Sequence, residues 1–167
     1  MKTLTQLHAD IDARVQIISD EHTDWLCRKG CDNCCKKLAE IPRLTQAEWQ
    51  LLKQGLLLLP TQQRLEIGER IAKLAEQHSR PLTCPMLNQA SGACMIYAHR
   101  PVACRTYGFY VQRDKGLYCQ DIETRVAAGH WTTVVWGNHD AIDRQLNALG
   151  ESRDLTDWFA LWQNNPT

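Results

Sequence analysis

The chain has no net charge and no long apolar segment, and these two absences exclude several classes of protein. Its 19 basic residues are balanced by 19 acidic ones, so we expect no strong attraction to nucleic acid or to an anionic membrane. Runs of apolar side chains such as "LLLL" at 56–59 are far too short to span a bilayer. We therefore predict neither a nucleic-acid partner nor a membrane partner.

The first residues also lack the features of a secretory leader. "MKTLTQLHADIDARVQ" is polar and periodic, and it contains no apolar stretch followed by small residues. We therefore expect a cytoplasmic protein, in which thiols stay reduced. The chain also has no phosphate-binding loop, dinucleotide fingerprint or serine nucleophile elbow, so the sequence identifies no catalytic residue.

Apolar periodicity and capping signals predict a mainly α fold. Apolar residues from Leu4 to Ile18 recur at helical spacing, and Thr45 with Glu48 matches a capping box that starts a helix over 46–57. A further helix is expected from Thr61, and two short helices end the chain. The apolar faces of these last three helices consist of Leu65, Ile67, Ile71, Leu74 and Ala75, of Ile142, Leu146 and Leu149, and of Leu155, Trp158, Phe159 and Trp162.

The length of 167 residues suits one small domain. We predict a single domain of short helices around an irregular, cysteine-rich core, with a minor β-hairpin. Its parts are an N-terminal helix at 1–25, the core at 27–108, and the hairpin and C-terminal helices at 109–167. "FYVQRDKGLYC" is expected to form the hairpin, with its turn at Asp114, Lys115 and Gly116, and "HWTTVVW" at 130–136 to form a short strand.

Eight cysteines stand out against this background. Half of them lie in "CRKGCDNCC". A chain of this size can bury a normal hydrophobic core, so it does not need cysteines to compensate for a small one. In a reducing compartment, cysteines act as metal ligands or catalytic groups more often than they form disulfides. The candidate metal ligands are Cys27, Cys31, Cys34, Cys35, Cys84, Cys94, Cys104 and Cys119.

Each of these cysteines has an alternative role as a small buried apolar residue. That alternative is weak for the four clustered cysteines, and for Cys119, which stands alone after the hairpin, packing and ligation are equally plausible. Cys34 and Cys35 are adjacent, which is an awkward geometry for two ligands of one ion. The spacing permits two sites of four sulfurs each, or one site that draws on both halves of the chain.

Basic residues accompany the cysteines. We expect those of "CRKGCDNCCKK" to compensate thiolate charge, and Arg100 and Arg105 to hydrogen-bond the sulfurs of a bound group, although each arginine could instead pair with a carboxylate. His99, His130 and His139 are expected at the surface and not as ligands. The cysteine spacing is also used by radical S-adenosylmethionine enzymes, but Asn33 replaces their usual aromatic residue, and the chain is too short for their barrel.

Three motifs together resemble the YkgJ-type cysteine-cluster family. They are "CRKGCDNCC", "IPRLTQAEW" and "CPMLNQASGACMIYAHRPVACRTYG", and they cover about 27–108. The family is described as a zinc- or iron-chelating domain and sometimes as an iron–sulfur oxidoreductase. The resemblance implies that Cys27, Cys31, Cys34, Cys35, Cys84, Cys94 and Cys104 chelate the metal. The chain has three residues between its first two cysteines, where many members have two, and Cys119 lies outside the recognised part.

Two functions follow as hypotheses. The first is an iron–sulfur protein, such as one with a 4Fe–4S cluster, that transfers electrons to an unidentified redox or protein partner. The second is a zinc-binding structural or interaction module without catalysis. A redox sensor or metal-delivery protein that uses Cys34 and Cys35 as labile thiols is a third possibility.

Overall fold

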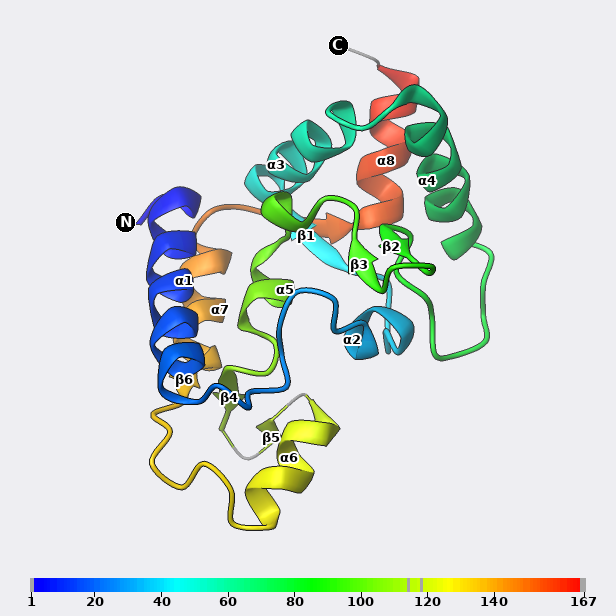
Figure 1. The fold of residues 1–167 in the computed structure, drawn as a ribbon. Helices are drawn as coiled ribbons and strands as arrows, with labels where there is room; N and C mark the ends of the chain where they lie inside the picture. The colour runs from blue at the N-terminus through cyan, green and yellow to red at the C-terminus, as the bar shows by residue number, and fades with distance from the viewer. Residues whose placement is uncertain (1, 114, 118, 166–167) are drawn as a thin grey trace. The chain divides into compact units, whose positions relative to one another are not determined.

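The computed structural model describes residues 2–113, 115–117 and 119–165, and in these ranges the fold is mainly α, as predicted (Figure 1). The α-helices in the described ranges are α1 (Leu4–Glu21), α2 (Asn33–Lys36), α3 (Gln46–Leu57), α4 (Thr61–Leu74), α5 (Val102–Thr106), α6 (Gln120–Ala127), α7 (His139–Asn147) and α8 (Leu155–Asn164), with a 3-10 helix η1 at Tyr97–His99. The strands there are β1 (Arg43–Thr45), β2 (Leu87–Asn88), β3 (Ala93–Cys94), β4 (Tyr110–Gln112), β5 (Gly116–Leu117), β6 (Gly137–Asn138) and β7 (Ser152–Asp154).

The chain divides into two compact units, each discontinuous in sequence. Unit 1 comprises Met1–Arg28 and Val102–Leu149, and unit 2 comprises Lys29–Pro101 and Gly150–Thr167. Each unit has its own core of buried apolar side chains. The single-domain organisation remains a prediction.

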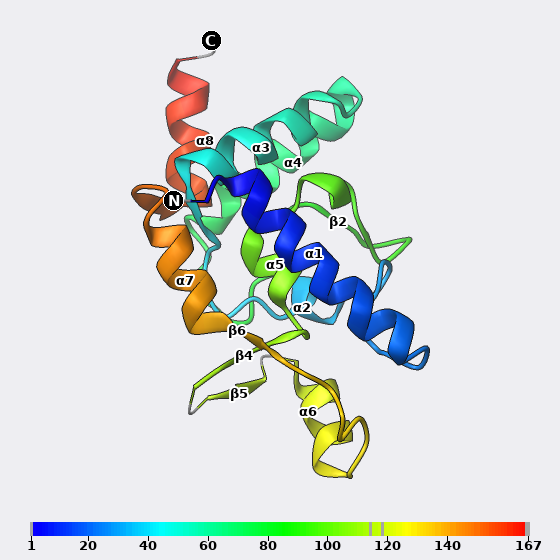
Figure 2. The ribbon, with the colours of Figure 1, turned by 90° about the vertical axis from the view of Figure 1, so that its left-hand side faces the viewer.

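Unit 1 is built on α1, which packs against α5 and α7 (Figure 2). The N-cap residue Thr3 starts α1 with a capping box shared with Gln6. Leu7, Ile11 and Ile18 are buried along one face of α1, which confirms the helix that their spacing predicts. Burial of this face supplies the main stabilising free energy of such an amphipathic helix.

A small sheet completes unit 1. Strand β4 pairs antiparallel with β5 and parallel with β6, so the predicted hairpin is confirmed. Asp114, part of the predicted turn, lies outside the described residues. Helix α6 follows the hairpin directly and was not anticipated from the sequence; Ile122 is its buried residue.

The predicted strand at 130–136 is wrong. These residues form turns and irregular structure, and β6 begins only at Gly137. Trp131 adopts a left-handed backbone conformation with φ of 55°, which a strand does not tolerate. Its indole Nε1 donates to Asp24 Oδ1 at 3.0 Å, and its ring lies 4.4 Å from that of Trp25. Tertiary packing of the tryptophan therefore overrides the local strand preference.

Unit 2 gathers α3, α4 and α8 around the second core (Figure 1). The Thr45 hydroxyl accepts from the Glu48 amide, and the Glu48 carboxylate accepts from the Thr45 amide at 2.9 Å. The predicted capping box and the helix over 46–57 are thus confirmed. Helix α4 starts at Thr61 as predicted, but Leu65, assigned to its apolar face, is 58% exposed. The buried face of α4 contains Ile67, Ile71 and Leu74.

The C-terminal segment returns to unit 2 beside the start of α3. Strand β7 pairs antiparallel with β1 in the register Leu44↔Arg153. Asp154 is the N-cap residue of α8, as predicted, although its side chain makes no capping hydrogen bond. Gly68 of α4 faces α8 closely, because a Cβ at this position would stand 2.8 Å from the Phe159 ring. In the described part of the chain, no helix is both long enough and apolar enough to cross a membrane.

Candidate metal site

Two backbone pairings bring the first and second cysteine segments together in unit 2. Leu38 and Leu82 form an antiparallel bridge, with hydrogen bonds of 2.9 and 2.8 Å between their amides and carbonyls. Next to this bridge, the Cys84 amide donates to the Cys35 carbonyl at 2.7 Å. The segment after α2 and the segment that carries Cys84 therefore run side by side. No local spacing rule reveals this long-range pairing.

A second pairing adds Cys94. The Leu87 amide donates to the Cys84 carbonyl at 3.1 Å, which closes a turn after Cys84. Leu87 is then the partner of Cys94 in the antiparallel pair of β2 and β3. Cys35, Cys84 and Cys94 are thus linked by short backbone contacts, and Cys34 joins them as the neighbour of Cys35 in α2.

The thiols of these residues also lie close enough to act on one another. Cys34 and Cys35 shift each other's pKa, and Cys84 shifts that of Cys35. The electrostatic influence of Cys94 reaches both Cys34 and Cys35. We call Cys34, Cys35, Cys84 and Cys94 the thiol cluster.

The surroundings hold three thiols of the cluster in their neutral form. The neighbouring Cys35 thiol, together with burial, raises the pKa of Cys34 far above its usual range. For Cys35, the Cys34 thiol lowers the pKa, but the Cys84 thiol and burial outweigh it and raise the pKa to about 12. Burial raises the pKa of Cys94 as well. Since metals bind thiolates, a metal ion has to displace these protons to bind here.

Arg100 lies close to the cluster, and Lys29 lies over the same tyrosine ring as Arg100. The Arg100 guanidinium stacks 3.5 Å from the centroid of the Tyr97 ring, and Lys29 Nζ lies 5.4 Å from it. The positive charge of Arg100 lowers the pKa of Cys94 against the effect of burial. Arg100 is therefore placed where it favours a thiolate at Cys94, and its expected hydrogen bonds to the sulfurs of a bound group remain a prediction. Lys36, in contrast, forms an ion pair of 2.5 Å with Asp32 one helical turn away.

The donor chemistry fits a metal, but the thiols do not form a coordination shell as they stand. Among the residues that the structure describes, no group of three or more His, Cys, Asp or Glu side chains is arranged to hold a metal ion. The cluster supplies four soft sulfur donors, as Zn²⁺ and iron prefer, with a cation nearby. Side-chain rearrangement is therefore needed before these sulfurs can share one metal ion.

Cys31 belongs to unit 2 but has no described contact with the cluster. It is half-buried in a tight loop whose Gly30 has φ of 94°. The Gly30 carbonyl and the Asp32 carboxylate lie near Gly92 in the turn between β2 and β3, since a Cβ at Gly92 would be 3.1 and 3.4 Å from them. The loop that carries Cys31 therefore packs on the turn before Cys94.

The remaining predicted ligands lie in unit 1. The Cys27 thiol donates to the Tyr107 carbonyl at 3.3 Å. Cys104 is exposed on α5, and Cys119 is buried in the core of unit 1 at the N-cap position of α6. The predicted set of eight thus separates into five cysteines of unit 2 and three of unit 1, and all eight are reduced thiols. Their ligand roles remain predictions.

The other candidate side chains make different contacts. Arg105 donates to Asp12 at 2.7 Å and is 10% exposed, so it takes part in the carboxylate pairing considered as its alternative. His139 contacts Asp143 one turn along α7, with 3.0 Å between Nδ1 and Oδ2. His99 packs on Gly55 of α3, and His130 is exposed.

A comparison with protein families gives one match over residues 26–128, with the family "CxxCxxCC: Putative zinc- or iron-chelating domain". The chain belongs to this family. The suspected cysteine-cluster family is thereby confirmed, and metal chelation is supported as its general property. The CxxCxxCC match extends past the recognised motifs to include Cys119. Searches of curated proteins and of solved structures each gave no match.

Proposed function

We propose that Cys34, Cys35, Cys84 and Cys94 bind one metal ion as four thiolates, with Zn²⁺ as the preferred ion. The observation that carries this proposal is the 2.7 Å hydrogen bond from the Cys84 amide to the Cys35 carbonyl, which sets the two cysteine segments side by side. The Cys34 and Cys84 thiols lie close enough to shift the pKa of Cys35. At a Zn–S distance of about 2.3 Å, the sulfurs of a tetrahedral site are about 3.8 Å apart, so side-chain rotation has to bring the four thiolates to one centre.

A closed site of four thiolates leaves no coordination position for a substrate or for reactive water. Its role is structural: it ties α2 to the segment of Cys84 and to β3, three parts of unit 2 that are held by short backbone pairings. Its charge of −2 is partly balanced by Arg100, which lies close enough to act on Cys94. The thiols stay reduced in the cytoplasm, the compartment that the sequence predicts.

An iron–sulfur cluster with an electron-transfer role is the second candidate. The observation in its favour is the number of reduced thiols, eight, which exceeds the needs of one zinc ion. A cluster binds its thiolates to separate iron atoms, so it uses more widely spaced thiolates than a single zinc ion. A redox protein partner is expected only in this case.

Metal and sulfide analysis of anaerobically purified protein tests the proposal. We expect one zinc ion per chain, no inorganic sulfide and no visible absorption. Cys84→Ser should abolish stoichiometric binding, whereas Cys104→Ser, at an exposed position in unit 1, should leave it intact. A brown protein that contains iron and sulfide would instead support the iron–sulfur cluster. Stoichiometric zinc that persists in Cys84→Ser and is lost in Cys104→Ser would refute the assigned ligand set.

A further inference from the structure

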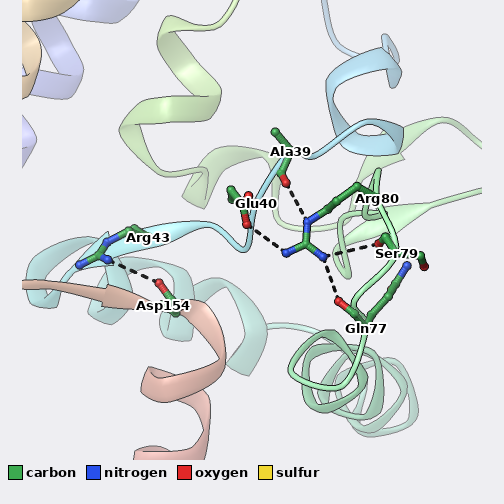
Figure 3. A network of polar contacts seen from close by, with 7 residues as sticks. All are labelled: Ala39, Glu40, Arg43, Gln77, Ser79, Arg80 and Asp154. Carbon is green, nitrogen blue, oxygen red and sulfur yellow. Dashed lines mark hydrogen bonds and ion pairs between the residues drawn. The ribbon is translucent and has the colours of Figure 1, made fainter.

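Two arginines outside the cysteine motifs donate hydrogen bonds to backbone carbonyl groups in and beside the segments that carry the candidate ligands. Arg80 lies between α4 and Cys84, and its guanidinium contacts both neighbouring segments (Figure 3). Its Nε donates to the Ala39 carbonyl at 2.8 Å, and Nη1 donates to the Gln77 carbonyl at 2.9 Å. Its Nη2 forms an ion pair with Glu40 at 3.0 Å. One side chain therefore joins the residues just after α2 to the residues just after α4.

This junction continues directly into the thiol cluster. Two residues beyond Arg80, Leu82 forms its bridge with Leu38, the neighbour of Ala39. Two residues further, the Cys84 amide reaches the Cys35 carbonyl. Arg80 thus fixes the outer end of a short two-stranded pairing whose inner end sets Cys35 beside Cys84.

Arg70 of α4 holds the other side of Cys84. Its Nη1 donates to the carbonyls of Pro85 and Leu87, both at 3.1 Å. Pro85 follows Cys84 directly, and Leu87 is the strand partner of Cys94. The guanidinium therefore locks the turn that sets Cys84 relative to Cys94, and it does so from a helix anchored in the core by Ile67 and Ile71.

We propose that Arg70 and Arg80 are positioning residues of the metal site, which pre-organise Cys35, Cys84 and Cys94 before the metal binds. This inference rests on the proposed function, since it assigns a role toward that same site. Hydrogen bonds from a charged donor to a carbonyl are stronger than neutral ones, and a planar guanidinium holds several carbonyls at once in a fixed geometry. Without these contacts, metal binding has to order the segments as well as deprotonate the thiols.

The test compares the Zn²⁺ dissociation constants of Arg70→Met, Arg80→Met and wild type by competition with a chromogenic chelator. Loss of groups that orient metal ligands typically weakens metal binding about 10- to 100-fold, and we expect about a 10-fold loss for each variant. Arg43→Met is the matched control. Arg43 also donates to a carbonyl in unit 2, that of Ser152 at 2.9 Å, and pairs with Asp154 (Figure 3), but neither partner is in a cysteine segment.

Lysine variants separate positioning from charge. If the arginines act only through their positive charge near thiolates, Arg70→Lys and Arg80→Lys should bind zinc as the wild type does. The carbonyl contacts predict that lysine restores only part of the affinity, because an ammonium group cannot reproduce the guanidinium fork. If the methionine variants fail to fold, the Zn²⁺ dissociation constants of the lysine variants are compared with that of the wild type instead.

Amide exchange of the metal-free protein gives a second readout. The Leu82 and Cys84 amides should exchange faster in Arg80→Met than in Arg43→Met. Unchanged zinc affinity in the Arg70 and Arg80 variants, with wild-type exchange at both amides, would overturn the inference and leave the proposed function standing. Absence of zinc binding in the wild type would instead overturn the proposed function itself.

Discussion

The Cys84 amide donates a hydrogen bond of 2.7 Å to the Cys35 carbonyl, and this contact joins two cysteine motifs that are far apart in sequence. It sets one ligand candidate of each motif beside the other before any metal is present. The Cys34 and Cys84 thiols both lie close enough to Cys35 to shift its pKa. The proposed site is therefore shared between the motifs and is not contained in the "CRKGCDNCC" loop alone.

Removal of the metal should loosen the segments that carry the thiol cluster. We expect a chelator to accelerate amide exchange at 33–38 and 82–95, since metal binding free energy is coupled to the order of its ligands. The amides of α1, in unit 1, serve as the internal control and should keep their rates. Equal acceleration throughout the chain would show that the metal stabilises more than the thiol cluster.

The capping box of α3 should contribute measurably to stability. Thr45→Ala removes the oxygen that accepts from the Glu48 amide, and such losses cost about 1–2 kcal/mol in the free energy of unfolding. Urea denaturation of the metal-free protein measures this. Thr61→Ala, at the exposed first residue of α4, is the control, with an expected change of at most about 0.5 kcal/mol. Equal effects of the two substitutions would contradict a specific role for the cap.

Gly108 should tolerate alanine less well than Gly129. Both glycines have left-handed backbones, with φ of 82° and 86°, so alanine strains both to a similar degree. A Cβ at Gly108 would also stand 3.0 Å from Cys27 Cβ and from Ile122 Cδ1, whereas nothing lies within 4 Å of one at Gly129. We expect Gly108→Ala to cost at least about 1 kcal/mol more in unfolding free energy. Equal melting temperatures would argue against this close packing.

His8 should make the protein sensitive to acid. Burial, and then the charge of Arg105, lower the pKa of His8 from 6.5 to about 4, while Asp12 opposes them. Between these two values the unfolded chain binds a proton that the folded chain does not, so stability is complete above pH 6.5 and is lost as the pH falls toward 4. From pH 7 to pH 5 the expected loss attributable to His8 is about 2 kcal/mol.

His8→Leu tests this, because Nε2 of His8 has no hydrogen-bond partner among the described residues that leucine would leave unpaired. Urea denaturation at pH 7 and pH 5 should show a smaller loss of stability in this variant than in the wild type. His78→Leu, at an exposed position, controls for the removal of a histidine. A pH dependence identical in His8→Leu and the wild type would contradict the assignment.

The local parts of the fold could be predicted from the sequence, because their signals are local. Thr45 with Glu48 marks the start of α3 through contacts between neighbours in the chain, and Leu7 and Ile11 show the periodicity of α1. The segment around Trp131 could not be predicted. Its conformation depends on Asp24 and Trp25, which are distant in sequence, whereas its composition alone predicts a strand.

The site could be predicted only as a set of residue types. The spacing of the cysteines indicates metal binding, but it does not indicate that Cys35 lies beside Cys84 or that Cys27 packs on Tyr107 in the other unit. Those positions depend on backbone pairings such as Leu38 with Leu82. Arg70 and Arg80 were missed because their partners are carbonyl groups, which every residue has and which therefore leave no pattern in a sequence.

Native mass spectrometry of the anaerobically purified chain tests the central claim most directly. A single zinc ion bound as a thiolate complex adds the mass of one zinc minus the protons displaced from the cysteines, and this species should be absent in Cys84→Ser. The account predicts that result. The mass of an iron–sulfur cluster, or a wild-type chain that stays metal-free when zinc is supplied, would contradict it.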